Sequence, residues 1–181
     1  MKEVQELGKS PILVTGDGRA ITESTTIATY LIKTYDTGGK LASEDWVKDD
    51  MLTSFAGATL GPLAAVELLF DLASNQTPWP AVYIMRGIWK VVKKQFSEAE
   101  FKKDLAYLEG ELGENEWFNG KNLGKCDIIL SYPIDMMAQR KWVDFESEYP
   151  RIAAWRKRIE ERDAWKRGLE KGNGYSLLFG S

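Results

Sequence analysis

The chain has 181 residues, of which 44% are hydrophobic and 28% are charged, as in an ordinary globular protein. The formal net charge is −3, which argues against a protein whose main surface binds the phosphates of nucleic acid. The sequence has no histidine and one cysteine. It therefore excludes Ser-His-Asp and Cys-His catalysis, His-ligated metals and an internal disulfide, and we expect no metal site. Residues 1–10 lack the apolar segment of a signal peptide, and residues 63–70, the longest apolar run, include Glu67 and are too short to span a bilayer.

The first 42 residues predict a small ββα unit. Residues 12–15 and 19–22 are β-prone runs, and the Gly-Asp-Gly turn at 16–18 between them indicates a hairpin. A helix is expected to begin near Thr22 to Ser24, because the residues after this point include apolar side chains at helical spacing: Ile27, Tyr30, Leu31 and Tyr35.

Helix signals dominate from Ser43 onward, and they predict an all-helical domain of about six helices. Ser43 is the expected cap of a helix that reads to Leu72 with a kink at Gly61-Pro62. A loop at 77–80 precedes a helix over 81–95, and the capping-box pattern of residues 97–100 predicts the start of another helix. Further helices are expected over 128–137, from Pro150, and over 163–171.

Four segments carry a resemblance to the glutathione S-transferase family. Residues 8–13 (GKSPIL) resemble the family's G-K-x-P-x-L segment, and ITES at 21–24 with Ile27, Tyr30 and Leu31 resembles I-x-E-S-x-x-I-x-x-Y-L. Residues 117–128 resemble the W-F-x-G-x-x-L-(S/T)-x-A-D-I core of the second domain, and YPRIAAW at 149–155 resembles the Y-P-x-I-x-x-W that follows it. The stretch 127–149 looks most like the fungal transferases of the yeast type.

The resemblance implies an α+β, mostly α chain with two domains. Residues 1–42 would be a partial thioredoxin-like domain that begins after the family's first β-α-β, and 43–181 would be the all-α C-terminal domain. The residue that activates the glutathione thiol lies after the first strand in the family, so the catalytic residue stays unassigned here. A second departure is Gly124, where the family has a Ser or Thr helix cap. Glycine is an acceptable cap, and Asp127 at the third helical position can still accept from first-turn N–H groups.

The expected glutathione-binding residues are Lys9, Ser10, Pro11, Glu23 and Ser24. A helix N-terminus attracts carboxylates, so Ser24 suits the γ-glutamyl carboxylate and Glu23 the ammonium group beside it. The resemblance implies a cis Ser10–Pro11 bond, whose backbone edge could pair with the cysteinyl unit, and Lys9 could meet the glycine carboxylate. Without the resemblance, the same residues read as a helix cap, an ordinary trans-proline and a solvated lysine.

Met51, Phe55 and Thr59 share one helix face and could line an apolar pocket for a co-substrate, although plain core packing explains them equally well. Cys126 is expected to be an inert core residue. Lys90, Lys93 and Lys94 are expected to form a solvated face.

The resemblance implies a cytoplasmic homodimer that binds glutathione as co-substrate. It would conjugate glutathione to a small hydrophobic electrophile or use it to isomerise one, with no nucleic-acid and no membrane partner. The alternative is a non-catalytic scaffold or interaction module of the same fold that has lost the thiol-activating residue.

Overall fold

A β-hairpin and one helix open the computed structural model, which describes residues 8, 10–172 and 174–178. β1 (Leu13–Val14) pairs antiparallel with β2 (Ala20–Ile21), so that Leu13 lies opposite Ile21. Gly18 has φ 83°, a left-handed conformation that glycine adopts easily in the turn between the strands. α1 (Ser24–Tyr35) follows at once. The hairpin and helix that the sequence predicts are both confirmed.

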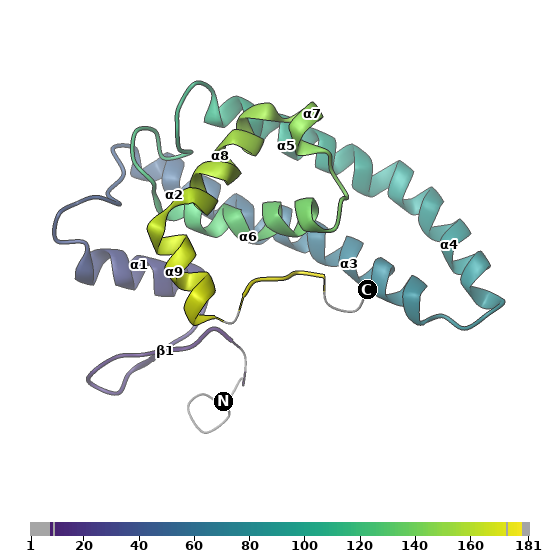
Figure 1. Ribbon diagram of the computed structural model, residues 1–181, viewed down its shortest axis with the longest axis horizontal. Coiled ribbons are helices and arrows are strands. Elements are labelled where there is room, and N and C mark those ends of the chain that lie inside the picture. Colours follow the sequence, from purple (N-terminus) through teal and green to yellow (C-terminus); the bar gives the residue numbers. More distant parts are fainter. Residues whose placement is uncertain (1–7, 9, 173, 179–181) are drawn as a thin grey trace.

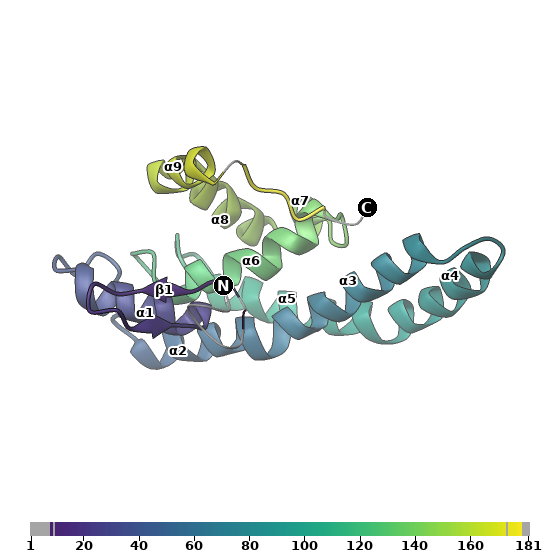
Figure 2. The ribbon, with the colours of Figure 1, turned by 90° about the horizontal axis from the view of Figure 1, so that it is seen from below.

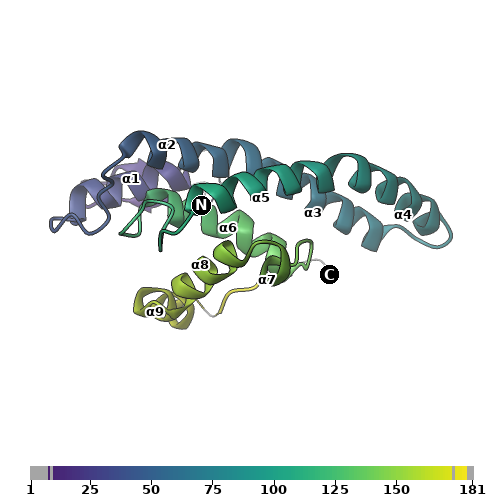
Figure 3. The ribbon, with the colours of Figure 1, turned by 90° about the horizontal axis from the view of Figure 1, so that it is seen from above.

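Two long helical rods form the largest part of the molecule and lie side by side (Figures 1 and 3). The first comprises α2 (Trp46–Phe55), a π-helical turn η1 (Ala56–Leu60) and α3 (Gly61–Gln76). The second comprises α4 (Ala81–Val92), a π-helical turn η2 (Lys93–Ser97) and α5 (Glu98–Leu112). The end of this hairpin, where α3 passes into α4, projects beyond the other helices in all three ribbon views (Figures 1, 2 and 3).

Two helix starts differ from those that the sequence predicts. Asp45, not Ser43, caps α2, and its side chain accepts a hydrogen bond from Lys48 N at 3.0 Å. Ser97 does not open a helix, because its backbone is itself helical and the rod continues through it. Its fully buried side chain lies in the hairpin, so packing overrides the local capping signal there. Pro62 falls in the first turn of α3, where its missing N–H is harmless.

The core lies where α6 (Lys125–Gln139) crosses the rods and is covered by α8 (Pro150–Glu161) (Figure 2). The short α7 (Phe145–Glu148), which the sequence did not indicate, leads into α8, and α9 (Asp163–Lys171) follows it. Fully buried large side chains in this core include Leu52, Leu60, Leu105, Phe118, Leu130, Ile134, Ile152 and Trp155. This mostly helical chain with one small sheet confirms the expected fold class.

The first rod, residues 46–76, is also apolar enough over an 18-residue window, with mean hydropathy 1.4, to cross a membrane by length and composition. The expectation that nothing in the sequence approaches a spanning segment is therefore wrong on this criterion, because the helix continues through η1. The same rod contributes Leu52, Leu60, Leu63 and Ala64 to the core, and core helices commonly pass this test.

Candidate functional site

A cleft of about 1080 Å³ lies between α1, the start of α3 and one side of α6. Four of the residues expected to bind glutathione line it together, although they are separated by a hairpin in the sequence: Ser10, Pro11, Glu23 and Ser24. The apolar face of α1, with Ile27, Ala28 and Leu31, continues the same wall. Lys9, the fifth expected residue, lies outside the described residues.

Glu23 immediately precedes α1 in an unusual backbone conformation, with φ 66° and ψ 119°. A non-glycine residue in this region is costly, and such residues concentrate at ligand sites. The Glu23 side chain forms no capping hydrogen bond within the described part of the chain. The first-turn N–H groups of α1, which have no partner inside the helix, are therefore available to an anion in the cleft.

Ser10 and Pro11 place a second backbone edge on the cleft, and the peptide bond between them is cis, as the resemblance implied. Both residues are exposed, and they precede β1 directly. The cleft thus brings together an extended backbone segment and a helix N-terminus, one suited to a peptide and the other to a carboxylate.

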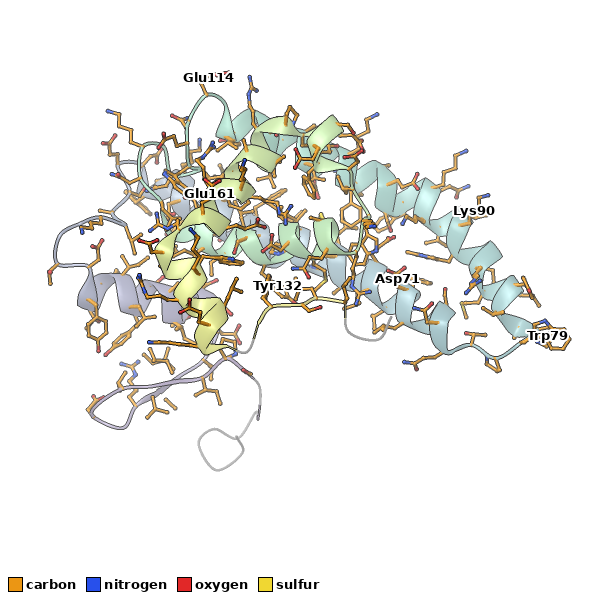
Figure 4. The ribbon with its side chains drawn as sticks, in the orientation of Figure 1. Asp71, Trp79, Lys90, Glu114, Tyr132 and Glu161 are labelled. Carbon is orange, nitrogen blue, oxygen red and sulfur yellow. The ribbon has the colours of Figure 1, made fainter. Side chains whose placement is uncertain are left out.

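The opposite wall comes from residues about a hundred positions later in the sequence. Ile128 and Tyr132 of α6 line the cleft and are 41% and 53% exposed, which is unusual for apolar and aromatic side chains on a central helix. Tyr132 is labelled in Figure 4. Small residues form its floor on the first rod: Ala56, Gly57, Gly61 and Ala65. Ile128 and Tyr132 were not predicted as site residues, and their one-turn spacing on α6 was the signal available in the sequence.

Met51, Phe55 and Thr59 are not among the residues that line this cleft. Phe55 packs on Tyr107 of α5 with ring centroids 5.4 Å apart, and the Tyr107 hydroxyl lies 3.9 Å from Met51 Sδ. That face of α2 is turned toward α5, and Thr59 is exposed in η1. Their role in binding a co-substrate stays a prediction.

Asp127 holds the N-terminus of α6 and so positions the cleft wall. Its Oδ1 accepts from Phe118 N and Trp155 Nε1, both at 2.8 Å, and its Oδ2 accepts from Gly124 N at 2.8 Å. Burial is the largest influence and raises the pKa of Asp127 above its usual range, while the hydrogen bonds from Gly124 and Phe118 lower it. The cap expected from Asp127 is confirmed.

Gly124 itself is closely packed against the side chain of Asn119. A Cβ placed on Gly124 would lie 2.5 Å from Asn119 Cγ, which is closer than any real contact. The Asn119 side chain therefore occupies the space that a larger capping residue would need.

Cys126 is fully buried next to this cap, as expected of a core residue. Its backbone N–H donates to Asp49 Oδ1 at 2.8 Å, which ties α6 to α2. Burial, together with the charges of Asp127 and Asp49, raises the pKa of its thiol far above its usual value, so this thiol is not a nucleophile at neutral pH. Lys125 forms ion pairs with Asp49 and Asp50 beside it.

Apart from the carboxylate of Glu23, the polar side chains that line the described cleft are hydroxyl groups. Ser10, Ser24, Thr25 and Tyr132 line it, and no cluster of three or more potential metal ligands occurs within the described residues. A hydroxyl can stabilise a thiolate by donating a hydrogen bond, and apolar Ile128 beside it suits a hydrophobic molecule.

Comparisons with known proteins match this architecture. The family model described as "Glutathione S-transferase, C-terminal domain" matches residues 90–163. Glutathione S-transferase 3 of Schizosaccharomyces pombe is 30% identical over 172 residues, covering 93% of this chain and 70% of that protein. Glutathione S-transferase 1 of Saccharomyces cerevisiae is 29% identical over 190 residues, covering 99% of this chain and 80% of that protein.

Solved structures show the same fold. The glutathione transferase URE2P8 of Phanerochaete chrysosporium, solved with oxidized glutathione, superposes with a TM-score of 0.73 at 23% identity, over 95% of this chain and 75% of that one. A glutathione S-transferase-like protein of Lodderomyces elongisporus gives a TM-score of 0.72 at 21% identity, over 93% and 76%. Fold, motifs and identity over most of the chain agree: it belongs to the glutathione S-transferase family, as a fungal-type member.

Proposed function

We propose that this protein binds glutathione in the cleft beside α1 and adds its thiol to a small hydrophobic electrophile. The observation that carries the proposal is the convergence of Ser10, Glu23 and Ser24 on one cleft, at the start of α1. The solved structures of the sphingomonad transferase with glutathione and of URE2P8 with oxidized glutathione support the ligand class.

The γ-glutamyl end and the cysteinyl unit of glutathione each have a matching group in the cleft. The γ-glutamyl carboxylate accepts hydrogen bonds from the Ser24 hydroxyl and the first-turn N–H groups of α1, and the Glu23 carboxylate pairs with the adjacent ammonium. The cysteinyl backbone pairs with the extended edge at Ser10.

The sulfur would then face α6, where Tyr132 can donate a hydrogen bond to the thiolate and Ile128 can contact the electrophile. A free thiol has a pKa of about 8.5, so a group that favours the thiolate is needed near neutral pH. We propose Tyr132 for this role, since its phenol is the hydroxyl on the far wall of the described cleft.

Calorimetry with S-methylglutathione tests binding separately from thiol chemistry. We expect measurable binding by the wild-type chain and about ten-fold or greater weakening in Glu23→Ala and Ser24→Ala, because each removes a charged hydrogen bond of roughly 1.5–3 kcal/mol. Glu44→Ala, another exposed acid near α2, should bind as the wild type does. If millimolar S-methylglutathione gives no heat of binding and does not protect the protein from thermal unfolding, the protein is a non-catalytic scaffold and not a transferase.

A turnover assay with an aryl halide tests the second half of the proposal. We expect slow conjugation, which Tyr132→Phe lowers by about ten-fold or more without changing S-methylglutathione affinity. Equal turnover in the variant would remove Tyr132 from the reaction and leave the binding proposal intact.

We also propose that the protein acts as a homodimer in the cytoplasm. Exposed aromatic and apolar side chains at the end of α1 and the start of α2 support a contact there: Tyr35, Trp46 and Val47. Sedimentation at micromolar concentration should show a dimer, and a monomer would contradict it.

A further inference from the structure

The outer face of α4 exposes a strip of apolar side chains to solvent. Ile84, Ile88 and Val91 are 70%, 55% and 54% exposed, and they follow one another at intervals of four and three residues along the helix. Helical geometry places such residues on one face. Trp79, at the tip of the hairpin (Figure 4), is 77% exposed, and Tyr83 in the first turn of α4 is 66% exposed.

The inner face of the same helix is already satisfied by the rod beneath it. Trp89 is 7% exposed and stacks on Phe70 of α3 with ring centroids 3.7 Å apart. Lys93 turns inward as well and pairs with the fully buried Glu67 at 2.7 Å. The strip is therefore additional to the packing of the hairpin, and its side chains contribute little to the core.

A row of cations accompanies the apolar strip. Residues 72–97 contain four basic side chains and no Asp or Glu, although the whole chain carries a net charge of −3. Lys93 is committed to Glu67, whereas Arg86, Lys90 and Lys94 are exposed and form no ion pair with any residue that the structure describes. Arg86 and Lys90 lie one turn apart, and Figure 4 shows Lys90 on the outer side of the rod.

We propose that the outer face of α4 docks in the plane of an anionic lipid bilayer surface. Ile84, Ile88 and Val91 form one face of α4, Lys90 and Lys94 lie toward one side of that face, and Arg86 lies on the far side of the helix. An apolar face with cations on the polar side, and Trp and Tyr at the helix end, is the composition of helices that rest in the headgroup region. The cations complement anionic headgroups, and the projecting hairpin can reach a flat surface without obstruction from α6–α9 (Figures 2 and 3).

A second copy of this chain fits the same face poorly. A symmetric contact through the apolar strip would bring Lys90 and Lys94 of both copies to the same interface, and several ammonium groups close together are unfavourable. The proposal departs from the expectation of no membrane partner, because that expectation considered only segments that span a bilayer, whereas this helix would lie on one.

Vesicle co-sedimentation of the full chain tests the proposal. We expect the wild-type protein to bind vesicles of phosphatidylcholine with phosphatidylserine, to bind pure phosphatidylcholine weakly, and to dissociate as salt is raised. Lys90→Gln with Lys94→Gln should lower the partition coefficient by about twenty-five-fold, since each cation contributes about five-fold. Ile84→Gln with Ile88→Gln should lower it by about ten-fold or more.

Matched variants separate this site from general charge and hydrophobicity. Lys121→Gln with Lys166→Gln removes the same charge elsewhere, and Val14→Gln with Leu178→Gln removes exposed apolar side chains elsewhere. Both pairs should bind vesicles as the wild type does. The proposal is overturned if wild-type protein ignores anionic vesicles, if binding is independent of lipid charge, or if the matched variants lose binding equally. It is also overturned if the protein does not bind vesicles and instead forms a dimer that the Ile84→Gln and Ile88→Gln substitutions dissociate.

Discussion

The junction of α6 with α8 and the far end of the α3–α4 hairpin use polar and apolar side chains in opposite ways. At the junction a carboxylate, Asp127, is buried and receives hydrogen bonds from three chain segments. At the hairpin end, Ile84 and Trp79 are mostly exposed. Farther back in the hairpin the carboxylate of Glu67 is buried and pairs with Lys93. The first region holds the fold together, whereas the outer face of the second is free to contact something else.

The largest effect should come from removing the Asp127 carboxylate. We expect Asp127→Ala to lower the free energy of unfolding by about 3 kcal/mol or more, because it leaves buried donors on Phe118, Gly124 and Trp155 without acceptors. Urea unfolding measures this. Asp144→Ala removes the exposed cap of α7 and should lower the free energy of unfolding by only about 1 kcal/mol. If both variants lose the same free energy of unfolding, Asp127 acts only as a helix cap.

The buried pair inside the hairpin should give the next largest effect. Lys93→Met leaves the Glu67 carboxylate buried and uncompensated, and we expect it to lower the free energy of unfolding by about 2 kcal/mol, since Lys93 is itself partly exposed. The double variant Glu67→Met with Lys93→Met should recover most of this loss in the same unfolding experiment. A double variant no more stable than Lys93→Met would mean that the pair is not the source of the effect.

An intermediate effect is expected where the hairpin meets the core. Trp142 Nε1 donates to Asp71 Oδ2 of α3 at 2.8 Å, and Trp142→Phe keeps an aromatic ring while removing this donor. The free energy of unfolding should fall by about 1 kcal/mol. Trp165→Phe, another partly buried indole on α9, provides the comparison for loss of ring size alone.

The smallest effect should come from the outer face of α4. Ile84→Gln should change the free energy of unfolding by no more than about 0.5 kcal/mol, because its side chain is already 70% exposed. Thermal unfolding followed by circular dichroism checks this. A loss as large as that of Trp142→Phe would show that Ile84 packs in the folded protein and would weaken the contrast between the two regions.

Local signals predicted the elements whose geometry depends on neighbours in sequence. The turn at 16–18, the start of α1 near Ser24, the Asp127 cap and Pro150 at the start of α8 all follow from short patterns and are present in the structure. The resemblance to the family's motifs also predicted that four residues share one binding site, and all four line the cleft: Ser10, Pro11, Glu23 and Ser24.

Features that depend on distant packing were not predictable in this way. The pattern at Ser97 is a good capping signal, but burial of its side chain in the hairpin keeps the helix continuous. Ile128 and Tyr132 look like core residues until the placement of α1 leaves them at a cleft. Periodicity shows that α4 is amphipathic, but only the position of α3 decides which part of its apolar face is covered.

The contact between Gly124 and Asn119 links the identities of two positions. Serine at 124 would collide with the Asn119 side chain, so Gly124→Ser alone should be harmful even though serine is the better helix cap. Shortening Asn119 to glycine would give up its hydrogen bond to the Ala42 carbonyl, at 3.3 Å, and reopen the space. Alanine would not, because the Asn119 Cβ lies 2.6 Å from where a Cβ on residue 124 would be. There is room for a larger side chain at position 119 or at position 124, but not at both. A change from glycine to serine at 124 during evolution therefore requires a smaller residue at 119 as well.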